Sequence, residues 1–250
     1  MPGPALFVTS HVRDRLHTLY ADRAHMHIDR LTTGGTQAVL TLPFGTAGQA
    51  AQNVATYASA LAEKHSREMR RIINTHGAGV TDSLTGLAVK DKLGLSLAHG
   101  ANKVSSWSID GGAGGVVAAG IGSAITGFQA DLMIIDDPFK NMVEAESPTT
   151  REKIIAGFSS DIYSRQAKEG TAVLVCQTRW HVDDLYGQLV RDGGWEYVNL
   201  PAIDEQGRAL WPEAFPVPRL EEIRRKGHFT DYQWGAMYQG SPIPRGGVVF

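Results

Sequence analysis

The stretch ADLMIIDDPFK, residues 130–140, decides the fold that we predict for this chain. Four apolar residues, Leu132 to Ile135, lead directly into Asp136 and Asp137, and Pro138 follows at once. A continuous apolar run between breakers is typical of a strand that is buried on both faces of a sheet. Because proline has no N–H to continue the ladder, the strand ends here, and both carboxylates are expected at its carboxyl end.

The adjacent carboxylates allow two interpretations. In open α/β sheets, ligands bind at the carboxyl ends of the strands. Asp136 and Asp137 repel each other unless a cation or a proton lies between them, and oxygen ligands beside substrate phosphates are how proteins usually hold Mg²⁺. The working hypothesis is therefore the magnesium-binding and water-activating end of an ATPase. The alternative is a strand end that is followed by an exposed acidic turn.

The composition narrows the class of protein. The chain has 250 residues, which is enough for one large domain or two small ones. Its 24 basic and 26 acidic residues exclude a histone-like coat of positive charge but allow a local nucleic-acid groove. The single cysteine, Cys176, lies in an apolar run and is expected to be a small core residue in a reducing compartment. With one cysteine and no HExxH motif, the chain has no zinc signature.

The sequence predicts no export signal and no membrane span. No N-terminal segment has the charged and then apolar pattern of a signal peptide. The most apolar window, residues 113–135, contains five glycines and Asp131, which makes it a poor membrane span. We therefore expect a soluble, cytoplasmic protein.

A candidate phosphate-binding loop precedes a long helical pattern. Residues 37–42 read as a short strand, and the turn PFGTAGQ at 43–49 follows it. A turn between a strand and a helix N-terminus is where phosphate-binding loops occur. A complete loop requires G-x-x-x-x-G-K-[ST], but here Gly48 precedes glutamine and alanine, so the lysine and the hydroxyl are missing.

Strands and helices alternate along the rest of the chain, which predicts a mostly parallel, doubly wound sheet. Ser147 is a candidate cap for the helix that follows the acidic strand. The basic residues of the first helix form a solvated face or, alternatively, contact nucleic acid or a neighbouring subunit; they are Lys64, Arg67, Arg70 and Arg71. Helices are expected at 47–74, 149–165, 182–190, 219–226 and 231–238, and strands at 105–109, 116–119, around 125, at 171–177 and at 195–200.

Several spaced motifs together resemble one family, the large terminase subunit of tailed bacteriophages and prophages, which is the motor that packages DNA. The pairing of IIDDP with TRWHVDDL is the most specific part of the resemblance. The matching pieces are TYASALAEKHSREMRRII (56–73), GVVAAGIGSAITGFQADLMIIDDPFKNMVEAES (115–147), QTRWHVDDLYGQL (177–189), LPAI (200–203), ALWPEAFP (209–216) and YQGSPIPRGG (238–247).

The resemblance implies a fold and a domain order. The fold is α/β, a mostly parallel doubly wound sheet of the P-loop (ASCE) ATPase type with a short helical C-terminal extension. Residues 1–36 would form a helical lead-in, and residues 37–203 a P-loop-like ATPase domain with a shortened phosphate-loop region. Residues 204–250, rich in proline and aromatic residues, would be a linker to a nuclease domain that this chain lacks.

The resemblance also implies roles for particular residues, with ATP and Mg²⁺ as the cofactors. Asp136 looks like the Mg²⁺-side carboxylate of the Walker B strand, and Asp137 like the carboxylate that orients the attacking water. Thr178 and Arg179 look like the motif that senses the γ-phosphate, although Arg179 can equally form a salt bridge with Asp183 or Asp184. Trp180 and His181 are expected to pack and to cap, and Glu144 and Glu146 to lie on the surface. The loop residues Gly45, Thr46 and Gly48 would bind the phosphates of the nucleotide.

The implied activity is ATP hydrolysis coupled to packaging of double-stranded DNA into procapsids, in the cytoplasm of a bacterial host. The implied partners are DNA, the small terminase subunit, the portal protein and other copies of this chain in a ring, without a membrane. The missing lysine leads us to carry an alternative: a catalytically impaired prophage remnant or assembly factor with the same fold. A third possibility is a metal-dependent nuclease that uses Asp131, Asp136 and Asp137, although Asp131 and Asp136 bracket a buried strand.

Overall fold

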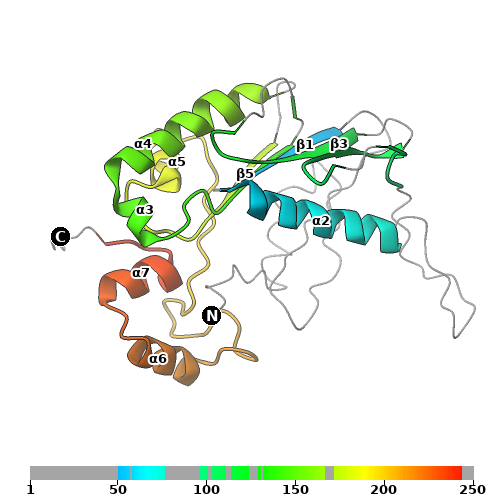
Figure 1. The fold of residues 1–250 in the computed structure, drawn as a ribbon. Coiled ribbons are helices and arrows are strands. Elements are labelled where there is room, and N and C mark those ends of the chain that lie inside the picture. The colour runs from blue at the N-terminus through cyan, green and yellow to red at the C-terminus, as the bar shows by residue number, and fades with distance from the viewer. Residues whose placement is uncertain are drawn as a thin grey trace, which may run out of the picture.

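A five-stranded sheet with the order β2-β3-β1-β4-β5 is the centre of the molecule (Figure 1). The computed structural model describes residues 50–56, 58–76, 96–100, 103–110, 114–123, 129–130, 132–166 and 172–243. Neighbouring strands are parallel except at one edge, where β2 runs antiparallel to β3. The strands are β1 (Ala50–Thr56), β2 (Ser106–Ser108), β3 (Gly114–Gly120), β4 (Leu132–Asp136) and β5 (Ala172–Cys176).

Strand β4 is the acidic strand that the sequence predicts, and it ends at Asp136 as expected. It pairs on one side with β1, where Thr56 lies opposite Asp136, and on the other with β5, where Cys176 does. Met133 and Ile135 are fully buried. A strand with parallel neighbours on both sides has its whole ladder satisfied, which is why the apolar run is continuous rather than alternating.

The predicted helix at 47–74 is wrong in its first third. Residues 50–56 form β1, and helix α2 (Ser59–His76) begins only after the connection at 57–58. Alanine favours helices, but β1 forms ladder bonds with both β3 and β4 along its length. Tertiary pairing of this kind overrides the modest helix propensity of a short alanine-rich segment.

A run of helical turns follows β4. Helix α3 (Met142–Glu146) leads into α4 (Pro148–Gly157), which continues as a π-helical turn η2 (Phe158–Ile162) and a 3-10 turn η3 (Tyr163–Arg165). Ser147 caps α4, because its side chain accepts a hydrogen bond from the Thr150 N–H. The predicted capping residue is therefore confirmed. Helix α5 (Leu185–Asp192) follows β5.

Two hydrophobic clusters hold these elements together. The first joins β4 to α4, η2 and α5 through Met133, Ile135, Phe158 and Leu185. The second joins α2 to β2 and β3 around Trp107, which is 3% exposed. Figure 1 shows α2 on one side of the sheet and α4 on the other.

The predicted strand at 195–200 is wrong. This segment has no regular secondary structure, and Tyr197 is exposed. Its polar groups are satisfied by helix α7 (Asp231–Gln239) rather than by a sheet: Asn199 Nδ2 donates to the Gln239 carbonyl at 3.0 Å. The predicted C-terminal helices are confirmed as α6 (Val217–Lys226) and α7.

Some predictions fall on residues that the structure does not describe. They are the lead-in at 1–36, the strand at 37–42, the loop residues Gly45, Thr46 and Gly48, the strand around 125, Asp131 and the segment 244–250. The P-loop type of the fold accordingly stays a prediction. Among the described helices, none combines the length and the apolar character that crossing a membrane requires.

Candidate functional site

The carboxyl ends of β1, β4 and β5 meet at one edge of the sheet. The register places Thr56 and Cys176 on either side of Asp136. Because these strands are parallel, the residues that follow them lie close together. The structure thereby brings together three of the predicted site residues: Asp136, Asp137 and Thr178.

Asp137 is held from two directions in an unusual backbone conformation. Its φ is +42°, in the left-handed region that residues other than glycine rarely adopt. Its N–H donates to the Cys176 carbonyl at 2.9 Å, and its Oδ1 accepts from the Thr178 N–H at 3.2 Å. These bonds fix the carboxylate against the end of the neighbouring strand. Backbone strain that the surroundings stabilise is common at functional sites.

Burial raises the pKa of Asp137 to about 6, and the neighbouring Asp136 carboxylate adds to the rise. The Thr178 N–H and His65 act in the opposite direction on that pKa. Desolvation and a like charge both disfavour the ionised carboxylate. A carboxylate with a pKa close to neutrality is suited to accept a proton or to orient a water molecule.

Asp136 contacts His65, a residue that our reading of the sequence missed. His65 Nε2 lies 3.1 Å from Asp136 Oδ2, and each side chain is about one-third exposed, at 32% and 34%. Nε2 is close enough for an ion pair but is not aligned for a hydrogen bond. The signal was available, because His65 stands three positions after the buried Ala62 and four before Met69 on a predicted helix.

The donor set at this edge suits a hard cation. Carboxylate oxygens are the ligands that Mg²⁺ prefers, and Mg²⁺ usually binds through one or two carboxylates together with waters and phosphates. The Cys176 thiol does not compete, because burial raises its pKa to about 12 and keeps it protonated. Asp136 and Asp137 therefore fit Mg²⁺. In the described part of the chain, no group of three or more metal-ligating side chains forms a closed cage.

Arg179 forms the salt bridge that the sequence left as its alternative role. Its Nε lies 3.1 Å from both carboxylate oxygens of Asp184, which is fully buried. The guanidinium also lies over the Tyr186 ring, 5.1 Å from its centroid. The Arg179 side chain is only 14% exposed, and its guanidinium is engaged by the Asp184 carboxylate.

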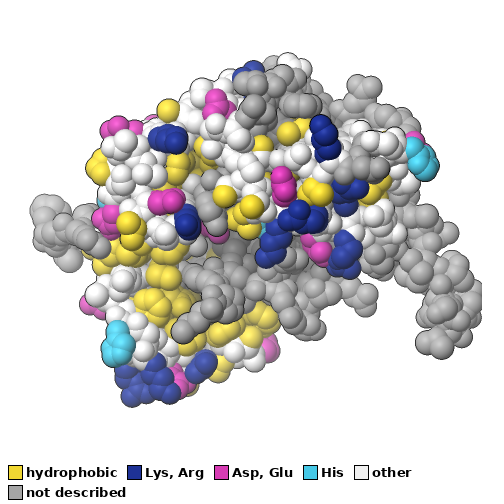
Figure 2. Space-filling view, viewed as in Figure 1, with side chains coloured by type: hydrophobic (Ala, Val, Ile, Leu, Met, Phe, Trp, Pro, Cys, Tyr) yellow, Lys and Arg dark blue, Asp and Glu magenta, His cyan; other side chains and the backbone are white. Residues whose placement is uncertain are grey.

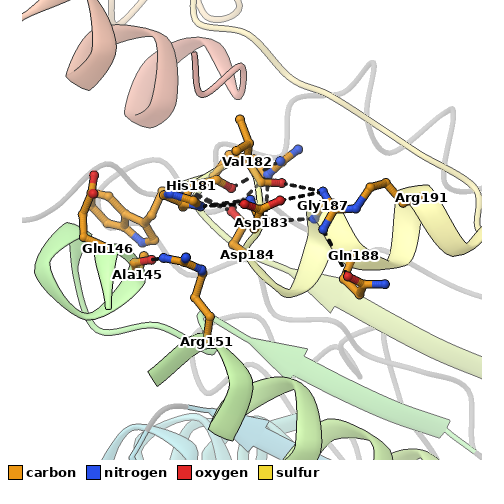
Figure 3. A network of polar contacts seen from close by, with 12 residues as sticks. Ala145, Glu146, Arg151, His181, Val182, Asp183, Asp184, Gly187, Gln188 and Arg191 are labelled. Atoms are coloured by element: carbon orange, nitrogen blue, oxygen red, sulfur yellow. Dashed lines mark hydrogen bonds and ion pairs between the residues drawn. The ribbon is translucent and has the colours of Figure 1, made fainter. Parts of the chain in front are cut away.

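Asp184 is the hub of the segment after β5 (Figure 3). It is the N-cap of α5, and its carboxylate accepts from the N–H groups of Trp180, His181 and Gly187. Gly187 allows this closure, since a Cβ at that position would lie 1.9 Å from the Val182 carbonyl oxygen. The segment 178–184 is thus folded around Asp184. It places the Thr178 N–H against Asp137.

Trp180 has the packing role that the sequence predicts, but the predicted capping role of His181 is wrong, because Asp184 is the N-cap of α5. Trp180 packs against the core cluster of β4 and α5. His181 Nδ1 accepts from the Asp183 N–H at 3.0 Å. Burial lowers the pKa of His181, and the nearby Arg151 adds to the effect.

The C-terminal helices are fastened to the same segment. The Tyr232 hydroxyl, on α7, contacts the Glu146 carboxylate at 2.8 Å and the Trp180 carbonyl at 3.0 Å. Glu146, predicted as a surface residue, therefore contributes to an internal contact. Glu144, the other predicted surface acid, accepts from the Lys140 N–H at 3.1 Å.

Two of the four basic residues of α2, Arg67 and Arg71, pair with acidic residues of the same helix, and Figure 2 shows basic and acidic side chains together on this face of the molecule. Arg67 lies 3.7 Å from Glu63, and Arg71 forms a close pair with Glu68. Both predicted roles of this face, a solvated surface or a contact with nucleic acid or a neighbouring subunit, stay predictions.

The nucleotide side of the site was predicted elsewhere in the chain. In the sequence, two residues separate β1 from α2, and neither of them is glycine or lysine. The predicted loop residues Gly45, Thr46 and Gly48 lie outside the described residues. The first residue of β1, Ala50, lies at the end of the sheet opposite Asp136.

Neither protein-family models nor curated proteins give a match to this chain when they are compared with it.

Proposed function

We propose that this chain is the ATPase portion of a terminase large subunit, which couples ATP hydrolysis to packaging of double-stranded DNA into procapsids. The observation that carries the proposal is the acidic pair at the end of β4, with Asp137 held by the Thr178 N–H of the neighbouring strand. It supports a Mg²⁺ and water-activating edge. By the resemblance, the partners are the small terminase subunit, the portal protein and further copies in a ring, in the bacterial cytoplasm.

In this proposal the two carboxylates have separate tasks. Asp136, the more accessible one, would hold Mg²⁺ in its ATP complex. Asp137 would orient the attacking water, for which its raised pKa of about 6 is suitable. Thr178 acts through its backbone N–H, which positions Asp137. Phosphoryl transfer depends mainly on positioning and charge, so these tasks suffice for this side of the site.

The test is steady-state ATP hydrolysis by the purified chain with Mg²⁺. Asp137→Asn is expected to abolish turnover while it keeps the acceptor for the Thr178 N–H. Asp183→Asn is the matched control, because Asp183 is 53% exposed and pairs with Arg191 on the surface. Turnover that survives in Asp137→Asn contradicts the assignment of Asp137.

A second candidate is a catalytically impaired remnant or assembly factor with the same fold. Two observations favour it: the two residues between β1 and α2 in the sequence include neither the glycine nor the lysine of a phosphate-binding loop, and Arg179 forms an ion pair with the buried Asp184. This candidate predicts no turnover in the wild-type chain, with the fold intact. Turnover that Asp137→Asn removes excludes it.

A further inference from the structure

Helix α2 begins at the edge of the sheet where Asp136 lies. Two residues separate β1 from α2 in the sequence, and Thr56, the last residue of β1, is paired with Asp136. Ser59, the first residue of α2, accepts a hydrogen bond through its hydroxyl oxygen from the N–H of Gly120, the last residue of β3, at 3.1 Å. The start of α2 is therefore tied to the same edge, and His65 follows about 9 Å along the helix axis.

The backbone around His65 is fixed by buried contacts on its inner side. Ala62 and Ser66 are both fully buried. The Ser66 hydroxyl donates to the Val104 carbonyl and accepts from Trp107 Nε1, the latter at 2.7 Å. A side chain on a helix that is locked in this way is presented in one place, which is what a positioning role requires.

Each carboxylate of the acidic pair has one oxygen engaged by a different element. The Thr178 N–H engages Asp137 Oδ1 at 3.2 Å, and His65 Nε2 lies 3.1 Å from Asp136 Oδ2. The remaining oxygens, Asp136 Oδ1 and Asp137 Oδ2, belong to adjacent residues at the carboxyl edge. Ligating carboxylates are commonly oriented by such outer contacts.

We propose that His65 is a positioning residue for Asp136. Its Nε2 lies against Oδ2 of the carboxylate at 3.1 Å, which leaves Oδ1 for a divalent cation. The proposal rests on the proposed function, because it assigns Asp136 to the cation. It differs from that function in assigning a role to α2, an element outside the acidic strand and its neighbour β5. The role of Asp136 could stand without it.

The experiment measures Mn²⁺ binding, with Mn²⁺ as a spectroscopic probe for Mg²⁺. The variants are His65→Ala, His65→Gln, Asp136→Asn and His99→Ala, the last being an exposed histidine beside the β2 end of the sheet. Loss of an outer contact typically weakens metal binding 10- to 100-fold. We expect His65→Ala to weaken Mn²⁺ binding by about 10-fold, and His65→Gln, whose amide can donate to Asp136, to regain most of it. His99→Ala is expected to bind as the wild type does.

The outcomes separate this proposal from the proposed function. Mn²⁺ binding that Asp136→Asn removes, His65→Ala weakens and His65→Gln restores, at equal melting temperatures, supports the proposal. Binding that Asp136→Asn removes but His65→Ala leaves unchanged or tightens overturns the role of His65 and keeps the cation at Asp136. No Mn²⁺ binding by the wild type, or binding that is unaffected by Asp136→Asn, overturns the cation site and the role of His65 with it.

Discussion

Among single residues, the site depends most on Asp137, whose carboxyl pKa lies at about 6, close to neutral pH. Asp137 is buried next to Asp136, and its pKa is raised to about 6 from an ordinary 3.8. Between these two pH values the folded state binds more protons than the unfolded state. The free energy of unfolding therefore falls as the pH rises from about 4 to about 6, and the cost is fully present above that range.

Asp137→Asn removes the destabilisation that comes from the ionised, buried carboxylate, and it keeps a side-chain oxygen as acceptor for the Thr178 N–H. The shift from 3.8 to about 6 is roughly 2 pKa units, equivalent to about 3 kcal/mol. We expect the variant to be more stable than the wild type by up to about 3 kcal/mol at pH 8, and equally stable at pH 4. Urea unfolding of both proteins at the two pH values measures this. If the two proteins differed in unfolding free energy by the same amount at both pH values, Asp137 would not be the titrating group.

Asp184 carries the largest predicted loss of stability among the charged residues. Asp184→Asn leaves the Arg179 charge without its partner, in a place where Arg179 is 14% exposed. Breaking a buried pair in this way costs about 3–5 kcal/mol. Denaturant midpoints measure the effect. The control is Asp183→Asn, since Asp183 is adjacent but exposed, and it should change stability by about 0–1 kcal/mol. Similar effects from both substitutions would contradict the hub role of Asp184.

At the scale of elements, the segment between β5 and α5 shows what sequence reasoning could supply. The strand, the helix and the candidate partners of Arg179 were all predictable from composition and order. The sequence could not show that Arg179 pairs with Asp184 rather than with Asp183. That preference depends on the N-cap geometry of α5, in which the Val182 carbonyl lies directly against Gly187. A preference between neighbouring acids is set by tertiary packing.

Gly187→Ala tests that closure directly. A Cβ at this position would lie 1.9 Å from the Val182 carbonyl oxygen, so the turn before α5 must move. We expect a loss of about 3 kcal/mol in the free energy of unfolding. Gln188→Ala, one position further along α5, changes a half-buried side chain and should cost less than about 1 kcal/mol. Thermal melts of the two variants make the comparison, and equal melting temperatures would refute the close approach.

The errors in the predicted elements have a common cause. Residues 50–56 read as helix because alanine is frequent there, and residues 195–200 read as the next strand in the alternating order of strands and helices. In each case hydrogen-bond partners distant in sequence decide the outcome: β3 and β4 for the first segment, and the end of α7 for the second. Local propensity carries no information about those partners.

At the scale of the whole molecule, the C-terminal helices are joined to the site through few contacts. Tyr232 on α7 reaches both Glu146 on α3 and Trp180, two residues after Thr178. The sequence predicted both C-terminal helices but assigned them to a linker. The structure instead shows the linker bonded to the segment that holds Asp137.

Tyr232→Phe tests this connection. Loss of the hydroxyl leaves the Trp180 carbonyl and the Glu146 carboxylate without these contacts, at an expected cost of about 1–3 kcal/mol. Tyr163→Phe is the matched control, because Tyr163 is 44% exposed and contacts its neighbours through its ring. It should alter stability by less than about 0.5 kcal/mol. Equal chemical denaturation curves for wild type and Tyr232→Phe would contradict the connection.

We propose that the carboxyl edge of β4 binds a magnesium–nucleotide complex. The decisive experiment is isothermal titration of the purified chain with ATP in the presence of Mg²⁺, with Asp136→Asn as the comparison. We expect Mg²⁺-dependent binding by the wild type that is strongly weakened in Asp136→Asn. No binding at millimolar ATP, or equal binding by the two proteins, would contradict it.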